Sequence, residues 1–479
     1  ADVYPLAPLQ EGLLFHHLLA DGGDDAYVQP NVLEFGSRDL LDRFAEALQR
    51  VLDRHDILRT GIVWDGLTEP VQVVWREAEL PVHEVALDPQ SGDLAEALAE
   101  AVGLSMDLSR APLVELHMAA GRDGRWLGLV RVHHMVQDQT ALDLLLGEIA
   151  AFLTGRGDEL PEPLPFRDFV AQARGGVTRE EHERYFATLL SDVTEPTAPY
   201  GLTDVSGVGA GAERAVRVLE PGLDERLRSV SRRLGASVAT VMHVAWARVL
   251  GAISGRDDVV FGTVLFGRMN AGAGADRVPG PFINTLPLRV PSDRLGVLKT
   301  VSAMRDQLAQ LLEHEHASLA VAQQASGITA GTPLFTSFLN YRHVLDRESV
   351  TQVEDGPVGN EPVAEEASAG IQTLLSRETS NYPLAVSVND SGRVIRLAVE
   401  AVAHADPEAV GALLSTALEG LVGALEMALD GGPEVPLSAV PVLDEAGLHR
   451  VVEEWNDTAV EVAADTLPGL FQAQVARTP

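Results

Sequence analysis

The sequence predicts an α/β protein with more than one hydrophobic core. Segments with helical spacing of apolar residues alternate with short, β-branched apolar segments along the chain, which favours mixed layers of helix and sheet. The length of 479 residues exceeds what one ordinary core accommodates, so two or more domains are expected. Between residues 191 and 212 the composition shifts to Thr, Pro, Gly, Ser and Ala without an apolar period, which indicates a connection between two lobes.

The first lobe is predicted to combine amphipathic helices with short strands. Its second predicted helix, for example, places Leu41, Phe44 and Leu48 on one face. The predicted helices are residues 8–19, 39–53 and 94–103, and the predicted strands are residues 27–35, 61–64 and 72–75. Residues 107–119 lead into another strand, and residues 127–146 are predicted as a buried strand, a polar loop and a helix that starts at Thr140.

The second lobe repeats this alternation with longer helices. Residues 258–267 form a continuous apolar run with β-branched residues, which is typical of a buried central strand. The predicted helices are residues 224–234, 237–250, 297–312 and 407–429, and the other predicted strands are residues 282–290, 333–341, 384–390 and 393–402. Residues 268–281 form a long Gly/Ala/Pro loop, residues 354–366 an acidic surface loop, and residues after 429 a linker.

Composition excludes several classes of function. The net charge of −34, from 36 basic and 70 acidic residues, disfavours binding to nucleic acid. The chain has no cysteine, so disulfides, thiolate nucleophiles and thiolate metal sites are excluded, and a cytoplasmic location is the simplest expectation. No signal peptide or membrane span is predicted. The N-terminus starts within a pattern, so we expect this chain to be part of a longer one.

Several catalytic motifs are missing from the sequence. It contains no GxSxG, no HExxH, no GxGxxG after a strand and no carrier-type Gly-Gly-Asp-Ser. The one lysine, Lys299, follows no Gly-rich loop, so neither a P-loop nor a lysine Schiff base is expected. The histidines at 16–17 and 314–316 lie on or at the end of predicted helices, and we interpret them as surface residues, so no metal site is expected.

Two adjacent histidines, His133 and His134, end the strand in residues 127–146, and Asp138 follows in the loop. Strand side chains alternate between faces, so the two histidines cannot share one pocket wall. Taken alone, the pair is more often structural than catalytic, as buried histidines with satisfied hydrogen bonds are common. The alternative is acid/base chemistry. An imidazole without a neighbouring nucleophile suits a direct transfer, in which His134 deprotonates an amine that attacks a thioester and Asp138 orients the loop.

Several segments of the chain resemble motifs of a known family. HHMVQDQ at residues 133–139 resembles the HHxxxDG motif of the condensation domains of nonribosomal peptide synthetases. Further segments match motifs of that family in the right order: residues 4–18, 54–60, 107–113, 257–268, 279–289 and 333–341. WNDT at residues 455–458 and LFQAQVARTP at the end resemble the junction with an adenylation domain.

The resemblance implies two chloramphenicol-acetyltransferase-like lobes that form a V-shaped pseudo-dimer with a central tunnel. Residues 1–180 would form the N-terminal lobe, residues 181–430 the C-terminal lobe, and residues 431–479 a linker and the start of an adenylation domain. Upstream donor and downstream acceptor peptidyl carrier domains would deliver both substrates on phosphopantetheine arms. The implied activity is peptide-bond formation between a donor acyl or peptidyl thioester and an acceptor aminoacyl thioester, with no cofactor bound by the domain itself.

The resemblance also assigns roles to individual residues. His134 matches the catalytic second histidine, as base or as orienter, and His133 and Asp138 match its supporting members. Arg289 matches the arginine expected to pair with Asp138. Gln139 stands where the family has glycine, and its side chain would narrow the acceptor path or shift the loop.

Two alternatives to condensation remain. A catalytically silent domain that binds carriers or recruits a partner enzyme is supported only by Gln139, because His134 and Asp138 are intact. An epimerisation domain shares HHxxxD but would be expected to differ in the strand at residues 282–290, and its added glutamate motif is missing here.

Overall fold

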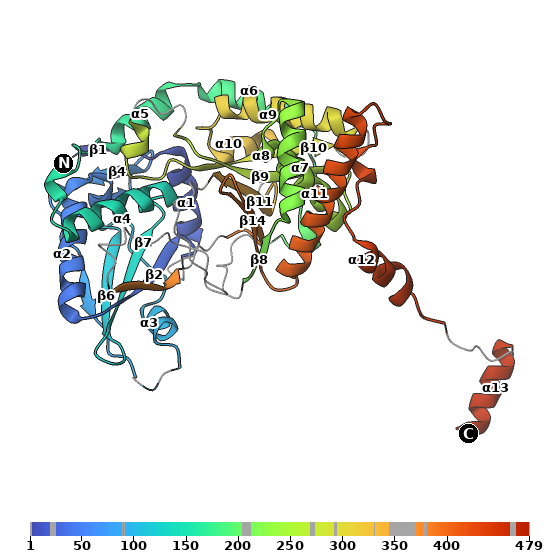
Figure 1. The fold of residues 1–479 in the computed structure, drawn as a ribbon, viewed down its shortest axis with the longest axis horizontal. Helices are drawn as coiled ribbons and strands as arrows, with labels where there is room; N and C mark the ends of the chain where they lie inside the picture. The colour runs from blue at the N-terminus through green and yellow to red at the C-terminus, as the bar shows by residue number, and fades with distance from the viewer. Residues whose placement is uncertain are drawn as a thin grey trace.

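The computed structural model describes residues 2–19, 25–88, 90, 92–203, 212–268, 274–291, 295–329, 331–343, 370–376, 381–459 and 466–478. Helices and sheets are mixed throughout, so the predicted α/β class is confirmed. Two halves lie side by side, each built on its own large sheet, and helices α5 (Phe166–Gly175) and α6 (Arg179–Leu190) pass from the first half to the second (Figure 1).

The first half contains a five-stranded sheet in the order β12-β2-β7-β6-β5 and a small sheet in the order β1-β4-β3. Amphipathic α2 packs against α4, and its buried face carries Leu41, Phe44 and Leu48, as predicted. The strands are β1 (Asp2–Pro5), β2 (Val28–Phe35), β3 (Thr60–Val63), β4 (Val71–Val74), β5 (Val82–Glu84), β6 (Val114–Ala120) and β7 (Trp126–His133). The helices are α1 (Pro8–Leu19), α2 (Arg38–Arg54), α3 (Leu94–Val102) and α4 (Gln139–Leu153).

The second half is built on a six-stranded sheet in the order β10-β9-β11-β13-β14-β8. Its core surrounds helix α8, whose Trp246 is fully buried, and the predicted central strand is β9. The strands are β8 (Glu213–Val218), β9 (Asp258–Leu265), β10 (Asn284–Pro291), β11 (Ser337–His343), β13 (Leu384–Asp390) and β14 (Ile395–Ala401). The helices are α7 (Pro221–Leu234), α8 (Val238–Ser254), α9 (Val297–Glu313), α10 (Leu319–Ala325) and α11 (Pro407–Leu429).

Two segments of the second half cross into the first. Strand β12 (Ile371–Ser376), which the sequence pattern did not predict, pairs antiparallel with β2 at the edge of the five-stranded sheet. Residues 275–282 place Ala275, Val278 and Phe282 in the hydrophobic core of the first half. The halves are therefore joined by a shared sheet and by a shared core, next to the loop that carries the two histidines. The predicted acidic loop at residues 354–366 lies outside the described residues, as do residues 204–211 and 269–273 of the other two predicted loops.

The C-terminal residues extend away from the two halves (Figure 1). Helices α12 (Glu445–His449) and α13 (Leu467–Arg477) bury no residue, and α13 exposes Leu467 and Phe471 by 84% and 71%. These residues include the segments that resemble the junction with an adenylation domain. That assignment stays a prediction, as do the lobe boundaries at residues 180 and 430.

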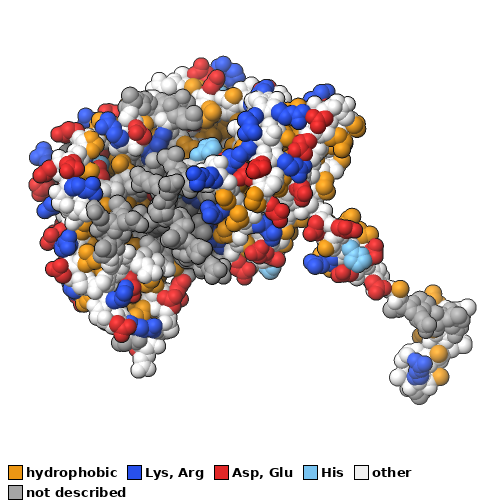
Figure 2. All heavy atoms as spheres, in the orientation of Figure 1, with side chains coloured by type: hydrophobic (Ala, Val, Ile, Leu, Met, Phe, Trp, Pro, Cys, Tyr) orange, Lys and Arg blue, Asp and Glu red, His pale blue; other side chains and the backbone are white. Residues whose placement is uncertain are grey.

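Helix α11 is, by length and composition, apolar enough to cross a membrane, and the bent pair of α7 and α8 passes the same test if it is counted as one span. In the fold, α11 packs against β8, β14 and α8, and its buried face includes Leu414, Leu418 and Leu421. These contacts are those of a core helix. On the face seen in Figure 2, acidic and basic side chains intermingle over both halves, so the net negative charge is spread over this surface.

His243 in the middle of α8 predicts a pH dependence of stability. Its Nδ1–H donates to the carbonyl of Ala239 at 2.7 Å, and its Nε2 is 2.7 Å from Oγ1 of Thr263. Burial lowers the pKa of His243 to about 4, below the ordinary value of 6.5. The unfolded chain therefore binds this proton first as pH falls, and stability is lost progressively below pH 6.5.

Between pH 7 and pH 4.5, we expect the free energy of unfolding to fall by about 2–3 kcal/mol less in His243→Gln than in the wild type. The measurement is urea unfolding of both proteins at each pH. His83→Gln, on the exposed strand β5, is the control and is expected to keep the wild-type pH dependence. The same pH dependence in the His243 variant and the wild type would contradict this assignment.

Candidate active site around His134

The two histidines lie at the end of β7, beside the start of β2. Val28 of β2 is in register with His133, and the backbone N–H of His134 donates to the carbonyl of Tyr27 at 2.8 Å. The prediction that the next helix starts at Thr140 is wrong, because α4 begins at Gln139. Asp138 is its N-cap, with a carboxylate that accepts the backbone N–H of Ala141 at 2.8 Å. The loop is therefore held by the sheet at one end and by a helix cap at the other.

His134 has a fixed tautomer. Its Nδ1 is 2.9 Å from the backbone carbonyl of Gln137, which can only accept, so Nδ1 carries the proton. Its Nε2 is 2.8 Å from the side-chain Nε2 of Gln29, which donates to the imidazole lone pair. Gln29 is oriented by Gln137, whose Nε2 donates to Oε1 of Gln29 at 3.0 Å. His134 is half-buried, and its basic atom is Nε2.

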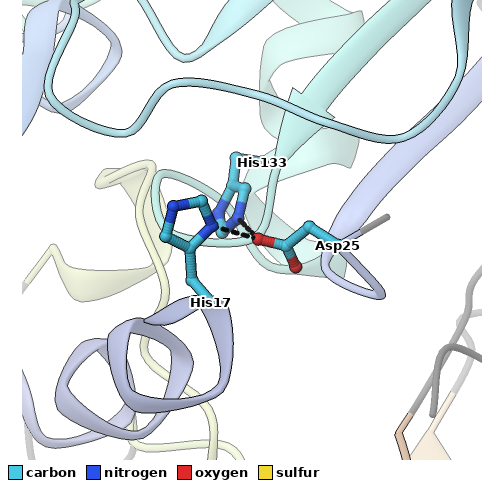
Figure 3. Close-up of side chains that lie close together, drawn as sticks. All are labelled: His17, Asp25 and His133. Carbon is cyan, nitrogen blue, oxygen red and sulfur yellow. Dashed lines mark hydrogen bonds and ion pairs between the residues drawn. The ribbon is translucent and has the colours of Figure 1, made fainter. Parts of the chain in front are cut away.

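His133 points to a different set of partners, as strand alternation predicted (Figure 3). Its ring is fully buried, and its Nδ1 accepts the backbone N–H of Met135 at 2.9 Å. Its Nε2–H then donates to Oδ2 of Asp25 at 3.0 Å, and Nδ1 of His17 lies 2.7 Å from the same oxygen. These contacts are consistent with the supporting role that the family resemblance implied for His133.

Burial and hydrogen bonding act in opposite directions on these groups. Burial alone would raise the pKa of Asp25, but the hydrogen bonds from His133 and His17 outweigh it and hold the pKa of Asp25 well below its ordinary value. Burial lowers the pKa of His133, although Asp25 favours its charged form. We therefore describe Asp25 as ionised and His133 as neutral at pH 7. This arrangement fixes the end of β7 and leaves His133 no free basic nitrogen.

The ligand atoms of His17, Asp25 and His133 lie within 4.8 Å of one another, close enough to be considered as a metal site. The hydrogen bonds argue against a metal. Since Nδ1 of His133 accepts a backbone N–H, the proton of the neutral ring is on Nε2, and no lone pair on Nε2 remains for a metal. We conclude that this group of three is a hydrogen-bonded support for the loop.

The predicted pair between Arg289 and Asp138 is wrong. Arg289 lies on β10, where antiparallel pairing with β9 brings it beside Asp258, and its guanidinium also reaches Asp192 after α6. Asp138 pairs with Arg268 instead, with 2.8 Å between Nη2 of the arginine and Oδ1 of the aspartate. The backbone N–H of Phe282 donates to Oδ2 of Asp138 at 3.0 Å. Both partners come from the second half: Arg268 follows β9, and Phe282 is the last residue of the crossing segment 275–282.

Arg268 fixes this crossing segment to the loop of the active site. Its Nη1 donates to the carbonyls of Ala275 and Val278 at 2.6 and 2.8 Å, and its guanidinium lies 3.9 Å from the ring centroid of Phe282. The ring of Phe282 in turn lies 4.0 Å from that of Phe169. The side chain of Asp138 is fully buried, so its charge is held almost entirely by Arg268 and by backbone N–H groups.

Gly267 allows the same segment to fold back closely. Its φ of +64° is favourable for glycine, and a Cβ at this position would lie 1.9 Å from the carbonyl oxygen of Phe282. The close approach of the two backbones places Arg268, the next residue, within reach of Asp138.

Gln139 is the first residue of α4, and its side-chain Nε2 donates to Oδ1 of Asp143 at 2.9 Å. The side chain is folded along the first turn of its own helix. Its predicted position in the acceptor path stays a prediction.

Sequence patterns missed five residues around His134. Asp25 lies next to a Gly-Gly-Asp segment that lacks the serine of a carrier site, and His17 was interpreted as a surface residue. Gln29 and Gln137 carry no catalytic signature. Arg268 follows β9 and is the last residue of one of the family-like segments, which was the only available signal for it.

Comparisons with known proteins agree on one family. Residues 1–428 match the family model of the condensation domain. The chain is 42% identical over 482 residues to malpibaldin synthetase of Mortierella alpina and 26% identical over 495 residues to bacitracin synthase 3 of Bacillus licheniformis. Each match covers 100% of this chain, but only 8% and 7% of those synthetases, so the chain spans less than a tenth of their length.

Solved structures show the same fold. The first condensation domain of the calcium-dependent antibiotic synthetase superposes with a TM-score of 0.66 at 18% identity, covering 93% of this chain and 100% of that domain. A four-domain nonribosomal peptide synthetase bound to AMP and glycine superposes with a TM-score of 0.74 at 14% identity, covering 99% of this chain and 36% of that protein.

Proposed function

The chain belongs to the condensation-domain family found in nonribosomal peptide synthetases, and we propose that it joins a donor acyl or peptidyl thioester to an acceptor aminoacyl thioester. The family in general forms amide bonds by condensation. The observation that supports the proposal for this chain is the state of His134, whose Nδ1 proton is held by a backbone carbonyl and whose Nε2 lone pair is left for a hydrogen-bond donor. Such a nitrogen is suited to accept a proton from an attacking amine.

The proposed reaction needs no group on the protein other than this base. The acceptor amine attacks the donor carbonyl carbon as Nε2 of His134 takes one N–H proton. The C–N bond forms and the C–S bond breaks. The departing sulfur then takes the proton from Nε2–H, so that the products are an amide and a thiol and His134 returns to its starting state. Holding both reactants near each other contributes up to about 7–11 kcal/mol of the lowering of the barrier.

The substrates are proposed to arrive on phosphopantetheine arms of an upstream donor and a downstream acceptor carrier domain. In this proposal the two lobes form a V, and the arms enter a tunnel between them and meet near His134. The segment of Arg268 and Phe282, which joins the two halves at Asp138, would keep the loop of His134 aligned with both lobes. Residues 431–479 would form a linker and the start of an adenylation domain, and the cytoplasm is the proposed location.

Reconstitution with loaded carriers tests the proposed activity. A donor carrier bearing an acyl-aminoacyl thioester and an acceptor carrier bearing an aminoacyl thioester are incubated with the intact chain, and the masses of both carriers are measured. We expect product on the acceptor only when the chain is present. Equal product without it would contradict the proposal. Carrier binding without product would favour the silent recruitment domain, and inversion at the donor residue without transfer would favour epimerisation.

Gln139 is proposed to restrict the acceptor. Gln139→Gly removes its side chain at the start of α4 and is expected to raise the rate with a bulky acceptor relative to a small one by about tenfold. The measurement is the ratio of the two rates in the same reconstitution. Gln172→Gly, on the exposed face of α5, is the matched control and is expected to keep the wild-type ratio. An unchanged ratio in the Gln139 variant would remove this residue from the acceptor path.

A further inference from the structure

We propose that Gln29 and Gln137 form an amide pair that sets the protonation state of His134 during catalysis. The proposal rests on the proposed role of His134 as the base and adds two positioning residues to it. The two glutamines come from different elements, β2 and the loop before α4, and they meet on the two nitrogens of one imidazole.

The three residues form a closed ring of hydrogen bonds. Nδ1–H of His134 donates to the backbone carbonyl of Gln137, the side chain of Gln137 donates to Oε1 of Gln29, and Nε2–H of Gln29 donates to Nε2 of His134. Gln29 and Gln137 are only 7% and 1% exposed, so each amide depends on the protein for its partners. The ring therefore fixes both the tautomer and the orientation of the imidazole.

In this arrangement the pair favours the unprotonated base. A proton on Nε2 of His134 would face the N–H of Gln29, which is unfavourable in a buried site. An imidazole nitrogen has one lone pair, so an acceptor amine must displace the N–H of Gln29 before Nε2 can take its proton. Before the substrate binds, the amide N–H of Gln29 therefore occupies the hydrogen-bond position on Nε2 that the acceptor amine will take.

A second arrangement of the same amides fits the protonated base. If the Gln29 amide turns about its last side-chain bond, its Oε1 accepts the new Nε2–H of His134. The N–H group of Gln29 then faces the side chain of Gln137. In the present arrangement, Oε1 of Gln137 has no hydrogen-bond partner among the described residues. If the Gln137 amide turns as well, this oxygen accepts the N–H of Gln29. Terminal amide torsions have two broad preferred orientations, so this exchange needs no movement of the backbone.

The two carboxylates described beside the loop, Asp138 and Asp25, are already paired with other side chains. The protonation state of His134 is therefore governed by the two amides. Asp138 on the loop is paired with Arg268, and Asp25 behind His133 is paired with His17 and His133. Just before β2, the hydroxyl of Tyr27 is also paired, because it donates to Oδ1 of Asn381 at 2.8 Å.

The test replaces Gln29 by glutamate, which can accept from Nε2–H but cannot donate to Nε2. We expect the acidic limb of the pH–rate profile for amide formation to move at least one unit to higher pH, with the rate recovering at high pH. Nitrogen NMR of labelled histidine, assigned with His134→Ala, is expected to show His134 protonated on Nδ1 alone in the wild type at pH 7.5. In Gln29→Glu it is expected to show both nitrogens protonated. Gln307→Glu is the control and should leave the profile unchanged, because Gln307 lies on α9 and its amide also bonds at both ends, to the backbone N–H and carbonyl of Arg289 on β10.

The outcomes separate this inference from the proposed function. Absence of amide formation by the wild type would contradict the function, whereas an unchanged profile in an active Gln29→Glu would contradict the amide pair alone. A loss of rate by the same factor at every pH would mark Gln29 as merely structural and would also contradict it. If Gln29→Glu does not fold, the wild-type spectrum decides, because a proton on Nε2 of neutral His134 is incompatible with the amide pair.

Discussion

Replacing His134 by alanine is expected to slow amide formation by about 10²–10⁴-fold, the usual contribution of a general base. The fold should persist, because the side chain of His134 is half-buried and its partners are the uncharged glutamines Gln29 and Gln137. The measurement is the single-turnover rate with both carriers loaded, together with the thermal unfolding temperature of the variant.

His83→Ala is the matched control, since this histidine lies on exposed β5 and stacks on the ring of His117. It is expected to keep the wild-type rate. A His134→Ala variant that folds and keeps the wild-type rate would show that proton transfer does not depend on this residue. Loss of rate together with loss of the folded state would mean that the residue is structural.

Arg268→Ala is expected to lower the free energy of unfolding by about 3–5 kcal/mol, the cost typical of removing one partner of a buried ion pair. The side chain of Asp138 is 0% exposed and that of Arg268 is 11% exposed, so the variant leaves a carboxylate without its cation inside the protein. The variant also frees the segment of Phe282 that joins the halves. Denaturant unfolding at pH 7 measures the effect.

Arg289→Ala provides the comparison that separates the two possible pairings of Asp138. The partners of Arg289, Asp192 and Asp258, are 71% and 40% exposed, so this pair is screened by water and we expect a loss of at most about 1 kcal/mol. Combining Arg268→Ala with Asp138→Asn removes the buried charge and keeps an acceptor for the helix cap, so part of the stability should return. A larger loss in Arg289→Ala than in Arg268→Ala would contradict the pairing described here.

The elements that the sequence predicted well are those whose pattern is local. The helix of residues 8–19 and the buried strand of β9 have complete apolar periods within the segment, and the structure forms both close to the predicted ends. The two faces of the strand before His134 were predicted for the same reason. The start of α4 was placed one residue late, because Thr140 and Asp138 are both possible caps and only the fold shows which side chain reaches a backbone N–H.

The contacts that were missed join residues far apart in the chain. β12 pairs with β2 more than 300 residues away, so no local period could show it. Arg268 and Arg289 are the last residues of two matched segments, 257–268 and 279–289. The choice between them depends on how the Gly267 turn and Phe282 fold back onto the first half. Asp25 contacts His133 from the residues just before β2, and Gln29 contacts His134 from β2 itself. Nothing in the identity of these two residues predicts that they lie beside the histidines.

The most direct test of the proposed condensation activity is the mass balance of a single turnover by the intact chain with one loaded donor carrier and one loaded acceptor carrier. We expect the mass of the acyl group to leave the donor and to appear on the acceptor at the same rate, and we expect His134→Ala to slow both changes together. Loss of the acyl mass from the donor without gain by the acceptor, or equal rates in the wild type and His134→Ala, would contradict the proposed activity.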